Sequence, residues 1–413
     1  MRTRIASATT RAVNATSRRL GRGQGTVAGG RAGLRVDPKL LEHLSAGRQV
    51  ALVSGTNGKT TTTRLLTVAL GAGGDEVVSN ETGSNMPPGH VAALAGTHAR
   101  RAVLEVDEVY LPRVLSATNA SAVVLLNLSR DQLDRTNEVR MVAGRWRAAL
   151  AAAPRTHVVA NADDPLVVWG AGAAADVHWV GAGMRWQHDA VGCPSCEGRI
   201  EFGEGPWKCR DCGFARPTTE VELVADGDRC PAALWADGRR HEVRLALPGR
   251  FNQANALLAA VAAEACGIDA VKALDAMAQV KDVAGRFTVR AFGETQARLM
   301  LAKNPAGWEE LLDLVAGGSA PLVVSINARV ADGADPSWLW DVPFERLAGR
   351  TVVATGDRYR DLSVRLRYAA VAHTTEADPA RAVIAAAAGG RADALVDVIG
   401  NYTAFHDLLG APA

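Results

Sequence analysis

The chain has 413 residues, enough for two or three domains with cores of their own. Hydrophobic residues make up 48% and charged residues 22%, a composition that excludes a disordered protein. The formal net charge of +2 excludes a strong general attraction to nucleic acid.

The first 36 residues are locally basic, with eight arginines and no acid before Asp37. A basic surface helix is the simplest interpretation of this segment, residues 1–40. A transit peptide has a similar composition, and a patch for anionic lipid or pyrophosphate is a third option. Neither a signal-peptide core nor an apolar run of ~20 residues is present, so we expect no transmembrane segment. The chain is predicted to be cytoplasmic, with peripheral contact to the inner face of the membrane left open.

A glycine loop follows the apolar run 50–53, with the sequence SGTNGKTTT from Ser54 to Thr62. A strand, a glycine loop, Lys-Thr and a helix together hold a nucleoside triphosphate. Lys59 places a charge near the β- and γ-phosphates, and the Thr60 hydroxyl can bind Mg²⁺. Only two residues separate the loop glycines, so this is a shorter variant of the general motif. The alternative is an ordinary turn before a helix. The predicted ATP-binding residues here are Gly55, Thr56, Asn57, Gly58, Lys59, Thr60 and Thr61, with Lys59 also catalytic.

Strand-like and helix-like segments alternate through the first large region. We expect strands at 49–53, 102–106, 122–127 and 157–160, and a helix at 138–153. The strands are short and apolar without alternation, which is typical of a doubly wound, mostly parallel sheet. Its ligand should lie beyond the carboxyl ends of the strands, where the glycine loop and the acids after Leu104 are found.

Two C-x2-C pairs, Cys193/Cys196 and Cys209/Cys212, lie twelve residues apart in a glycine- and proline-rich insert, residues 187–220. Two such turns can build a tetrahedral site of four thiolates. A disulfide or a redox pair is the alternative, but a cytosolic chain disfavours structural disulfides. We therefore predict a four-cysteine zinc ribbon with a structural Zn²⁺. Cys230 and Cys266 read as packed thiols.

The predicted secondary structure changes twice in the rest of the chain. Residues 221–247 predict antiparallel strands with turns at Asp226-Gly227 and Asp237-Gly238, and residues 251–266 predict a helix. A second alternating pattern begins after Arg286, with strands at 297–301, 321–326, 351–354 and 395–399 and helices at 308–315, 362–368 and 379–388. We expect a central ATP-binding domain over 41–288 and a smaller Rossmann-like α/β domain over 289–413.

These motifs resemble the Mur ligase family, which makes amide bonds with ATP. The matching blocks run in family order: Gly55–Thr61, Leu104-Glu105-Val106, Asn127–Arg135, Asn161–Pro165, Gly249 with Asn252–Ala256, and Gly285-Arg286. The resemblance implies that Glu105 and Thr60 hold Mg²⁺. It also implies that Asn255 and Arg286 contact the nucleotide. Asp107 and Glu108, beside Glu105, are left open as charges at a strand end.

The chain also departs from the amino-acid-adding ligases of the family. Gln132 replaces an expected histidine, and Met300 and Lys303 stand where an aspartate and a histidine are expected. These departures, the ribbon and the runs 327–341 and 361–369 resemble the ligase-like subunit of lipid II isoglutaminyl synthase. The resemblance implies ATP-dependent amidation of the α-carboxylate of D-glutamate in the lipid II stem peptide, through an acyl phosphate.

The source of ammonia is a separate question. Neither Cys230 nor Cys266 lies in a nucleophile context, so this chain is not expected to hydrolyse glutamine. The resemblance implies a heterodimer with a glutaminase subunit of the GatD type. It also implies that this chain lends a carboxylate to the partner's catalytic histidine. Asp361 is our candidate, with Asp357 as the alternative, and a helix N-terminal acid is the structural interpretation of Asp361. Trp338 and Trp340 are left as candidates for the partner interface.

Three other functions remain possible from the sequence. One is an amino-acid-adding ligase similar to folylpolyglutamate synthase. A second is a nucleotide-gated binding module that carries out no chemistry. The third is a zinc-ribbon nucleic-acid-binding ATPase, which the balanced charge of the ribbon disfavours. We therefore expect no nucleic acid partner.

Overall fold

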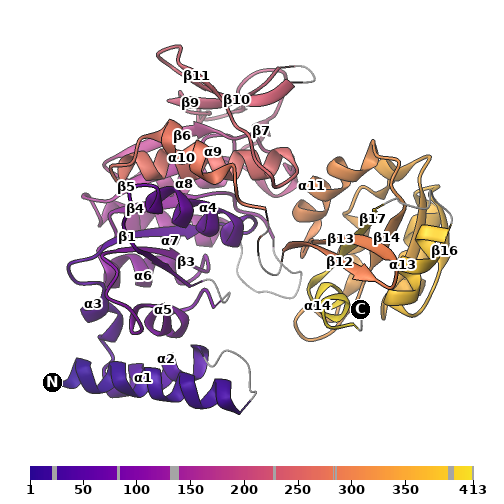
Figure 1. Cartoon of the computed structure of the whole chain (residues 1–413). Helices are drawn as coiled ribbons and strands as arrows, with labels where there is room; N and C mark the ends of the chain where they lie inside the picture. Colours follow the sequence, from indigo (N-terminus) through magenta and orange to yellow (C-terminus); the bar gives the residue numbers. More distant parts are fainter. Residues whose placement is uncertain are drawn as a thin grey trace. The chain divides into compact units, whose positions relative to one another are not determined.

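The computed structural model describes residues 1–20, 26–80, 84–130, 139–226, 229–281, 283, 286–388 and 395–411. They form two compact units, the first from Met1–Ser129 with Asn137–Lys281 and the second chiefly from Asp282–Ala413. Figure 1 shows the first unit in indigo to salmon and the second in orange to yellow. Within the described part of the chain, none of the helices combines the length and apolar character needed to cross a bilayer.

A nine-stranded sheet forms the centre of the first unit, in the order β11-β10-β9-β6-β5-β4-β1-β3-β2. Pairing is parallel from β2 through β9, and β10 and β11 continue the sheet antiparallel. Its strands are β1 (Gln49–Ser54), β2 (Val77–Ser79), β3 (Arg101–Glu105), β4 (Ala122–Leu125), β5 (His157–Asn161), β6 (Val177–Gly181), β9 (Val221–Asp226), β10 (Arg229–Trp235) and β11 (Arg240–Glu242).

The predicted mostly parallel α/β fold is confirmed, and the central strands are buried on both faces as their apolar runs indicate. Their bounds differ slightly: the strand expected at 102–106 is Arg101–Glu105, and the one expected at 122–127 ends at Leu125. Strands β2 and β6 are not predicted from the sequence. β2 has only three residues, and the first three residues of β6 are half-buried, so neither has the apolar run of a buried strand. Gly227 of the first expected turn lies outside the described residues, whereas Gly238 forms the second with a φ of 87°.

Helices cover the sheet of the first unit: α4 (Lys59–Gly71), α5 (Pro87–Leu94), α6 (Leu111–Thr118), α7 (Val139–Ala151), α8 (Pro165–Ala171), α9 (Arg250–Ala265) and α10 (Ala270–Met277). Helix α9 packs against α4 and against the sheet strands β4 and β5. It therefore places its polar residues beside the start of α4.

The basic N-terminal segment folds into α1 (Arg2–Arg19) and α2 (Thr26–Val36), followed by α3 (Leu40–Ser45). Helix α2 packs on α5 closely enough that a Cβ on Gly30 would lie 1.8 Å from the Pro88 carbonyl oxygen. Only glycine fits there. Arg11 of α1 donates to the carbonyl of Ala95 at 2.9 Å. The segment is thus fastened to the first unit by its helix packing and by this arginine.

The second unit has a six-stranded sheet in the order β12-β13-β17-β14-β15-β16, parallel except for the β12–β13 pair. Its strands are β12 (Phe287–Phe292), β13 (Thr295–Leu301), β14 (Leu322–Ser325), β15 (Thr351–Thr355), β16 (Ala372–Thr375) and β17 (Val396–Gly400). Its helices are α11 (Pro305–Ala316), α12 (Tyr359–Tyr368), α13 (Pro379–Ala388) and α14 (Tyr402–Gly410), with short turns η2 (Pro336–Trp340) and η3 (Phe344–Leu347).

A buried arginine joins α12 to these two turns. Arg365 is 5% exposed and donates to the carbonyl oxygens of Leu339 at 3.2 Å and Val342 at 2.7 Å. It also pairs with Glu345 at 2.8 Å. These carbonyls have no water to replace the guanidinium if it is removed.

We predict that Arg365→Met lowers the free energy of unfolding of the second unit by about 3 kcal/mol, because it leaves buried acceptors without a donor. Arg367→Met, on the exposed face of the same helix, is the matched control and should change little. Urea unfolding followed by circular dichroism measures both. Equal stability of the two variants would contradict the structural role of Arg365.

Candidate nucleotide and metal sites

The glycine loop joins β1 to α4 at the carboxyl end of the central sheet. Gly58 has a left-handed φ of 84° and immediately precedes α4. Gly55 has a φ of 145°, and a Cβ there would lie 2.9 Å from Cβ of Leu126. Gly58 therefore needs glycine for its left-handed backbone conformation. Gly55 needs glycine because Leu126, which follows the neighbouring strand β4, leaves no room for a side chain. The result is a tight loop that presents N–H groups at the N-terminus of a helix, where anions bind.

The Lys59 side chain folds back over this loop. Its ammonium donates to the carbonyl oxygens of Gly55 at 2.6 Å and Thr56 at 3.1 Å, and it pairs with Glu108 at 3.3 Å. Lys59 is only 9% exposed. The lysine charge thus lies within the loop, held at three points, before any phosphate is present.

The segment after β4 braces the loop from the other side. Asn127 accepts from the Asn57 N–H at 2.8 Å and donates back to the Asn57 carbonyl at 3.0 Å. The Thr56 hydroxyl donates to the Ser129 carbonyl and accepts from the Ser129 N–H, both at 3.0 Å. The predicted loop residues Thr56 and Asn57 are therefore occupied in holding the loop's shape.

Glu105 ends β3 beside the loop and is 3% exposed. Its backbone is fixed by Asn80, which accepts from its N–H at 2.8 Å and donates to its carbonyl at 3.0 Å. His90 also donates to this carbonyl, at 2.8 Å. Within the described residues, the Glu105 carboxylate makes no hydrogen bond or ion pair. A buried carboxylate beside a threonine-bearing phosphate loop fits the oxygen ligands that Mg²⁺ takes.

Asn255 is the other predicted residue that the structure brings to the loop. It lies on α9, is 8% exposed, and its side-chain oxygen would be 2.8 Å from a Cβ on Gly58. Arg286, the other residue expected to contact the nucleotide, belongs to the second unit. Gln132 and Gly285 lie outside the described residues. The sequence alone does not identify Glu108 as the partner of Lys59, or Asn80 and His90 as supports of Glu105, because these contacts join segments far apart in the chain.

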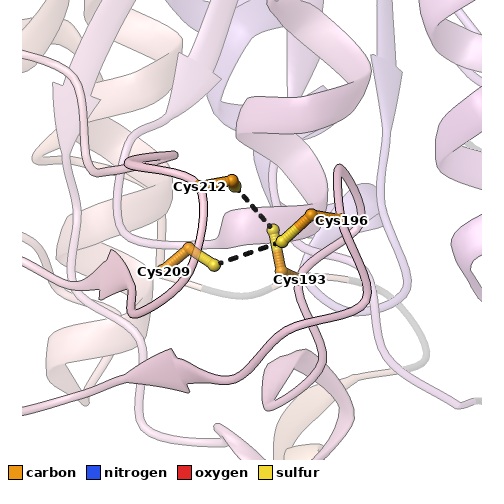
Figure 2. Close-up of side chains that lie close together, drawn as sticks. All are labelled: Cys193, Cys196, Cys209 and Cys212. Atoms are coloured by element: carbon orange, nitrogen blue, oxygen red, sulfur yellow. Dashed lines mark hydrogen bonds between the residues drawn. The ribbon is translucent and has the colours of Figure 1, made fainter.

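The four predicted zinc ligands converge in the insert (Figure 2). Cys193 and Cys212 have sulfurs 3.7 Å apart, and those of Cys196 and Cys209 are 3.5 Å apart. A disulfide needs about 2.05 Å, whereas sulfurs of a tetrahedral zinc site lie about 3.8 Å apart. The Asp211 N–H donates to the Cys209 sulfur and lowers the pKa of this thiol to about 7. The donor set is thus compatible with Zn²⁺.

The insert also has a small core that joins it to the sheet. Trp207 packs with Ile200, Cys193 and Cys209, and its indole N–H donates to the carbonyl of Ala162 at 3.0 Å. The paired strands β7 (Ile200–Glu201) and β8 (Lys208–Cys209) are only two residues long. Strands this short need further support, which a bound metal can supply.

The two remaining thiols are packed, as predicted. Burial raises the pKa of Cys266 to about 11, and burial also raises the pKa of Cys230, whose thiol lies 3.3 Å from the Val243 carbonyl oxygen. A nucleophilic cysteine needs a lowered pKa. Cys230 and Cys266 therefore lack the lowered pKa of a nucleophilic thiol.

The two candidate acids of the second unit differ in how firmly they are held. Asp357 takes two hydrogen bonds from Arg329, at 2.7 and 3.2 Å, and Arg329 also pairs with Asp407. Asp361, in the first turn of α12, pairs with Arg358 at 2.8 Å and is about half exposed. Asp361 would therefore break fewer of the observed contacts than Asp357 if its side chain turned toward another molecule.

Comparison with known protein families gives one match in each of the two units. Residues 53–191 match the Mur ligase middle domain and residues 301–405 match the MurT ligase C-terminal domain. The chain belongs to the Mur ligase family. The first match begins in β1 and contains the phosphate loop, Glu105 and Asn127.

Relatives with similar sequences span most of the chain. It is 28% identical to the lipid II isoglutaminyl synthase subunit MurT of Streptococcus pneumoniae, over 84% of this chain and 82% of that one. The Staphylococcus aureus (strain COL) MurT subunit is 29% identical, over 86% and 85%. A pseudomurein peptide ligase type C from Methanothermus fervidus has a similar fold, with a TM-score of 0.66 and 21% identity over 90% of this chain and 81% of that one.

We predict that acid destabilises the first unit through His90. Burial lowers the pKa of His90 to about 4, whereas an unfolded histidine titrates near 6.5. Between these values the unfolded chain binds a proton that the folded chain does not, so stability falls with falling pH, by roughly 3 kcal/mol in total. His90→Gln can still donate to the Glu105 carbonyl but does not titrate. Urea unfolding should show a shallower pH dependence for this variant; the same slope would contradict the assignment.

We predict that Cys193→Ser lowers the bound zinc by one equivalent per chain and loosens the insert, because a four-ligand site loses one thiolate. Zinc content by mass spectrometry and proteolysis within residues 187–220 are the measurements. Cys230→Ser, outside the cluster, is the matched control and should keep its metal. Wild-type protein without zinc or iron would contradict the site.

Proposed function

We propose that the chain is the synthetase subunit of an ATP-dependent amidotransferase of peptidoglycan synthesis. It converts the α-carboxylate of D-glutamate in the lipid II stem peptide to the amide, giving D-isoglutamine. The observation that carries the proposal is the lysine-bearing loop after β1 in a chain whose residues 301–405 match the MurT ligase C-terminal domain. The names of the pneumococcal and staphylococcal relatives support the same reaction. The MurT match favours amidation over addition of an amino acid.

The phosphate loop and its neighbours bind ATP in this proposal. The N–H groups from Gly55 to Thr61 and the Lys59 ammonium receive the phosphates, so Lys59 exchanges its loop carbonyls for phosphate oxygens. Asn255 and Arg286 contact the base and ribose. Thr60 and Glu105 hold Mg²⁺, which would neutralise charge on the transferred phosphoryl group.

The reaction proceeds in two steps. A carboxylate oxygen of D-glutamate attacks the γ-phosphorus and ADP leaves, giving an acyl phosphate. Ammonia then attacks the acyl carbon, phosphate departs with the C–O bonding electrons, and the nitrogen gives up a proton. The loop contributes by positioning and by neutralising charge, which is most of what phosphoryl transfer requires.

The remaining parts of the chain support this reaction. We assign residues 41–288 to ATP binding, 289–413 to a Rossmann-like domain that meets the partner, and the four-cysteine ribbon at 187–220 to a structural zinc site. The basic segment 1–40 favours a cytoplasmic protein that binds peripherally to the inner face of the membrane, where the lipid-linked substrate is available. Exposed arginines of α1 support this contact: Arg2, Arg4, Arg18 and Arg19.

A glutaminase of the GatD type supplies ammonia as the second subunit of a heterodimer. The raised pKa values of Cys230 and Cys266 support a separate source of ammonia. Asp361 orients the partner's catalytic histidine, and the same helix exposes Val364 and Tyr368. Trp340 is 54% exposed and packs edge-on against Tyr368, with ring centroids 5.3 Å apart. An exposed aromatic pair beside Asp361 suits an interface anchor, whereas Trp338 is buried against Trp308.

We predict that Lys59→Ala lowers ATP-dependent amidation at least about 100-fold, since it removes a charge from the transferred phosphoryl group. The assay supplies ATP, lipid II and ammonium and follows phosphate release and peptide mass. Lys272→Ala, a lysine on α10 outside the loop, is the matched control. Full activity of a folded Lys59→Ala would contradict the nucleotide site.

We predict that Asp361→Asn reduces glutamine-dependent amidation by the reconstituted pair while ammonium-dependent amidation continues. The carboxylate would act on the partner's histidine, not on the ATP site. Asp357→Asn serves as the alternative variant in the same two assays. If only Asp357→Asn lost glutamine hydrolysis, the role would move to Asp357; if neither did, the proposed contribution to the partner would be wrong.

A further inference from the structure

A second group of metal-ligating side chains lies in the first unit, away from the phosphate loop. His157, Asp176 and His178 each offer a ligand atom, and these atoms lie within 4.8 Å of one another. The Asp176 carboxylate lies 2.5 Å from Nδ1 of His157 and 3.7 Å from Nε2 of His178. All three side chains are partly exposed, although Nε2 of His178 is itself a buried atom.

The sheet register places these side chains together. His157 begins β5, Asp176 immediately precedes β6, and His178 is the register partner of Val159. Side chains alternate along a strand, so His157 and Val159 share a face, and His178 lies diagonally across from His157 on that face. The Asp176 carbonyl accepts from the Val158 N–H at 3.0 Å, which fixes the backbone between the two histidines. The cluster is therefore at the amino ends of β5 and β6, whereas the phosphate loop follows the carboxyl end of β1.

A fourth residue orients His178. Its Nδ1 lies 2.9 Å from the carboxylate of Glu220, which comes just before β9, the next strand in the sheet. The Glu220 N–H donates to the Trp179 carbonyl at 2.9 Å, so this carboxylate is anchored to β6. With Nδ1–H donating to Glu220, Nε2 of His178 is the nitrogen with the lone pair. A carboxylate behind a histidine in this way is the usual arrangement of metal-binding histidines.

Nε2 of His178 is also a buried polar atom without a hydrogen-bond partner in the described structure. Its 3.7 Å separation from Asp176 is too long for a hydrogen bond. Two ligands about 2.0–2.1 Å from one tetrahedral zinc ion lie roughly 3.4 Å apart, so a small side-chain movement lets both bind the same ion. The carboxylates of Asp176 and Glu220 also bring negative charge that a divalent cation balances.

We propose that His157, Asp176 and His178 form a binding site for a divalent transition-metal ion such as Zn²⁺, with Glu220 as the positioning residue behind His178. Imidazole nitrogens select zinc, nickel, cobalt or copper over Mg²⁺ and Ca²⁺. Zn²⁺ binds Nδ1 of His157 in the tautomer whose proton is on Nε2, so the Nδ1 proton donated to Asp176 moves through solvent to Nε2 of the same ring. Three protein ligands leave one position for water or an outside ligand. The site joins the amino ends of β5, β6 and β9, at the opposite end of the strands from the phosphate loop.

The test uses the full chain with its cysteine-bound metal retained, after dialysis against a weak chelator that empties weaker sites. Calorimetric titration with Zn²⁺ should show one further equivalent per chain for the wild type and none for His178→Ala. Glu220→Gln should bind about 10–100-fold more weakly, because the histidine loses its orienting carboxylate. His241→Ala is the matched control: His241 also pairs with an aspartate, Asp275 at 3.1 Å, outside the cluster.

Asp176→Asn gives a second variant that keeps the side-chain size if His178→Ala unfolds, and it too should lose the equivalent. A thermal shift on adding Zn²⁺ should follow the same order among the variants. The proposal is overturned if the wild type takes up no zinc beyond the cysteine site, or if His178→Ala and Asp176→Asn bind it as the wild type does.

Discussion

The proposed nucleotide site depends on one constraint: the glycine loop that carries Lys59 is held in its shape by buried neighbours. Gly55 and Gly58 allow the loop to turn tightly, and Asn127 fixes it through two hydrogen bonds. Groups that are already oriented need little reorganisation when charge develops, which is why such sites accelerate phosphoryl transfer. Glu108 balances the Lys59 charge in a place that is largely closed to water.

Other parts of the first unit support the loop and the end of β3 beside it. His90 and Asn80 fix the end of β3, and α9 brings Asn255 against Gly58. The four-cysteine insert is joined to the sheet through Trp207, so a metal bound by the cysteines would strengthen the region beyond β6. The second unit offers a different chemistry, a half-exposed acid on α12 beside exposed aromatic side chains, suited to a partner protein.

Local features of this chain could be read from the sequence, whereas cross-strand contacts could not. The phosphate loop and the four-cysteine cluster each depend on spacing within a short segment, so the sequence alone predicts Lys59 and Cys193 as site residues. The parallel sheet was predicted from its buried apolar strands, although β2 and β6 were missed because one is very short and the other begins with half-exposed residues. The pairing of Lys59 with Glu108, and of His157 with His178, depends on strand order, which a single sequence does not specify.

The most direct test of the account follows oxygen through the reaction. Lipid II labelled with ¹⁸O in the α-carboxylate of D-glutamate is incubated with ATP, ammonium and the chain, and the products are separated by mass. If the loop around Lys59 transfers the γ-phosphoryl group to this carboxylate, one ¹⁸O atom appears in inorganic phosphate for each amide formed. Label found in AMP, or amide formed while the phosphate stays unlabelled, would contradict activation through an acyl phosphate.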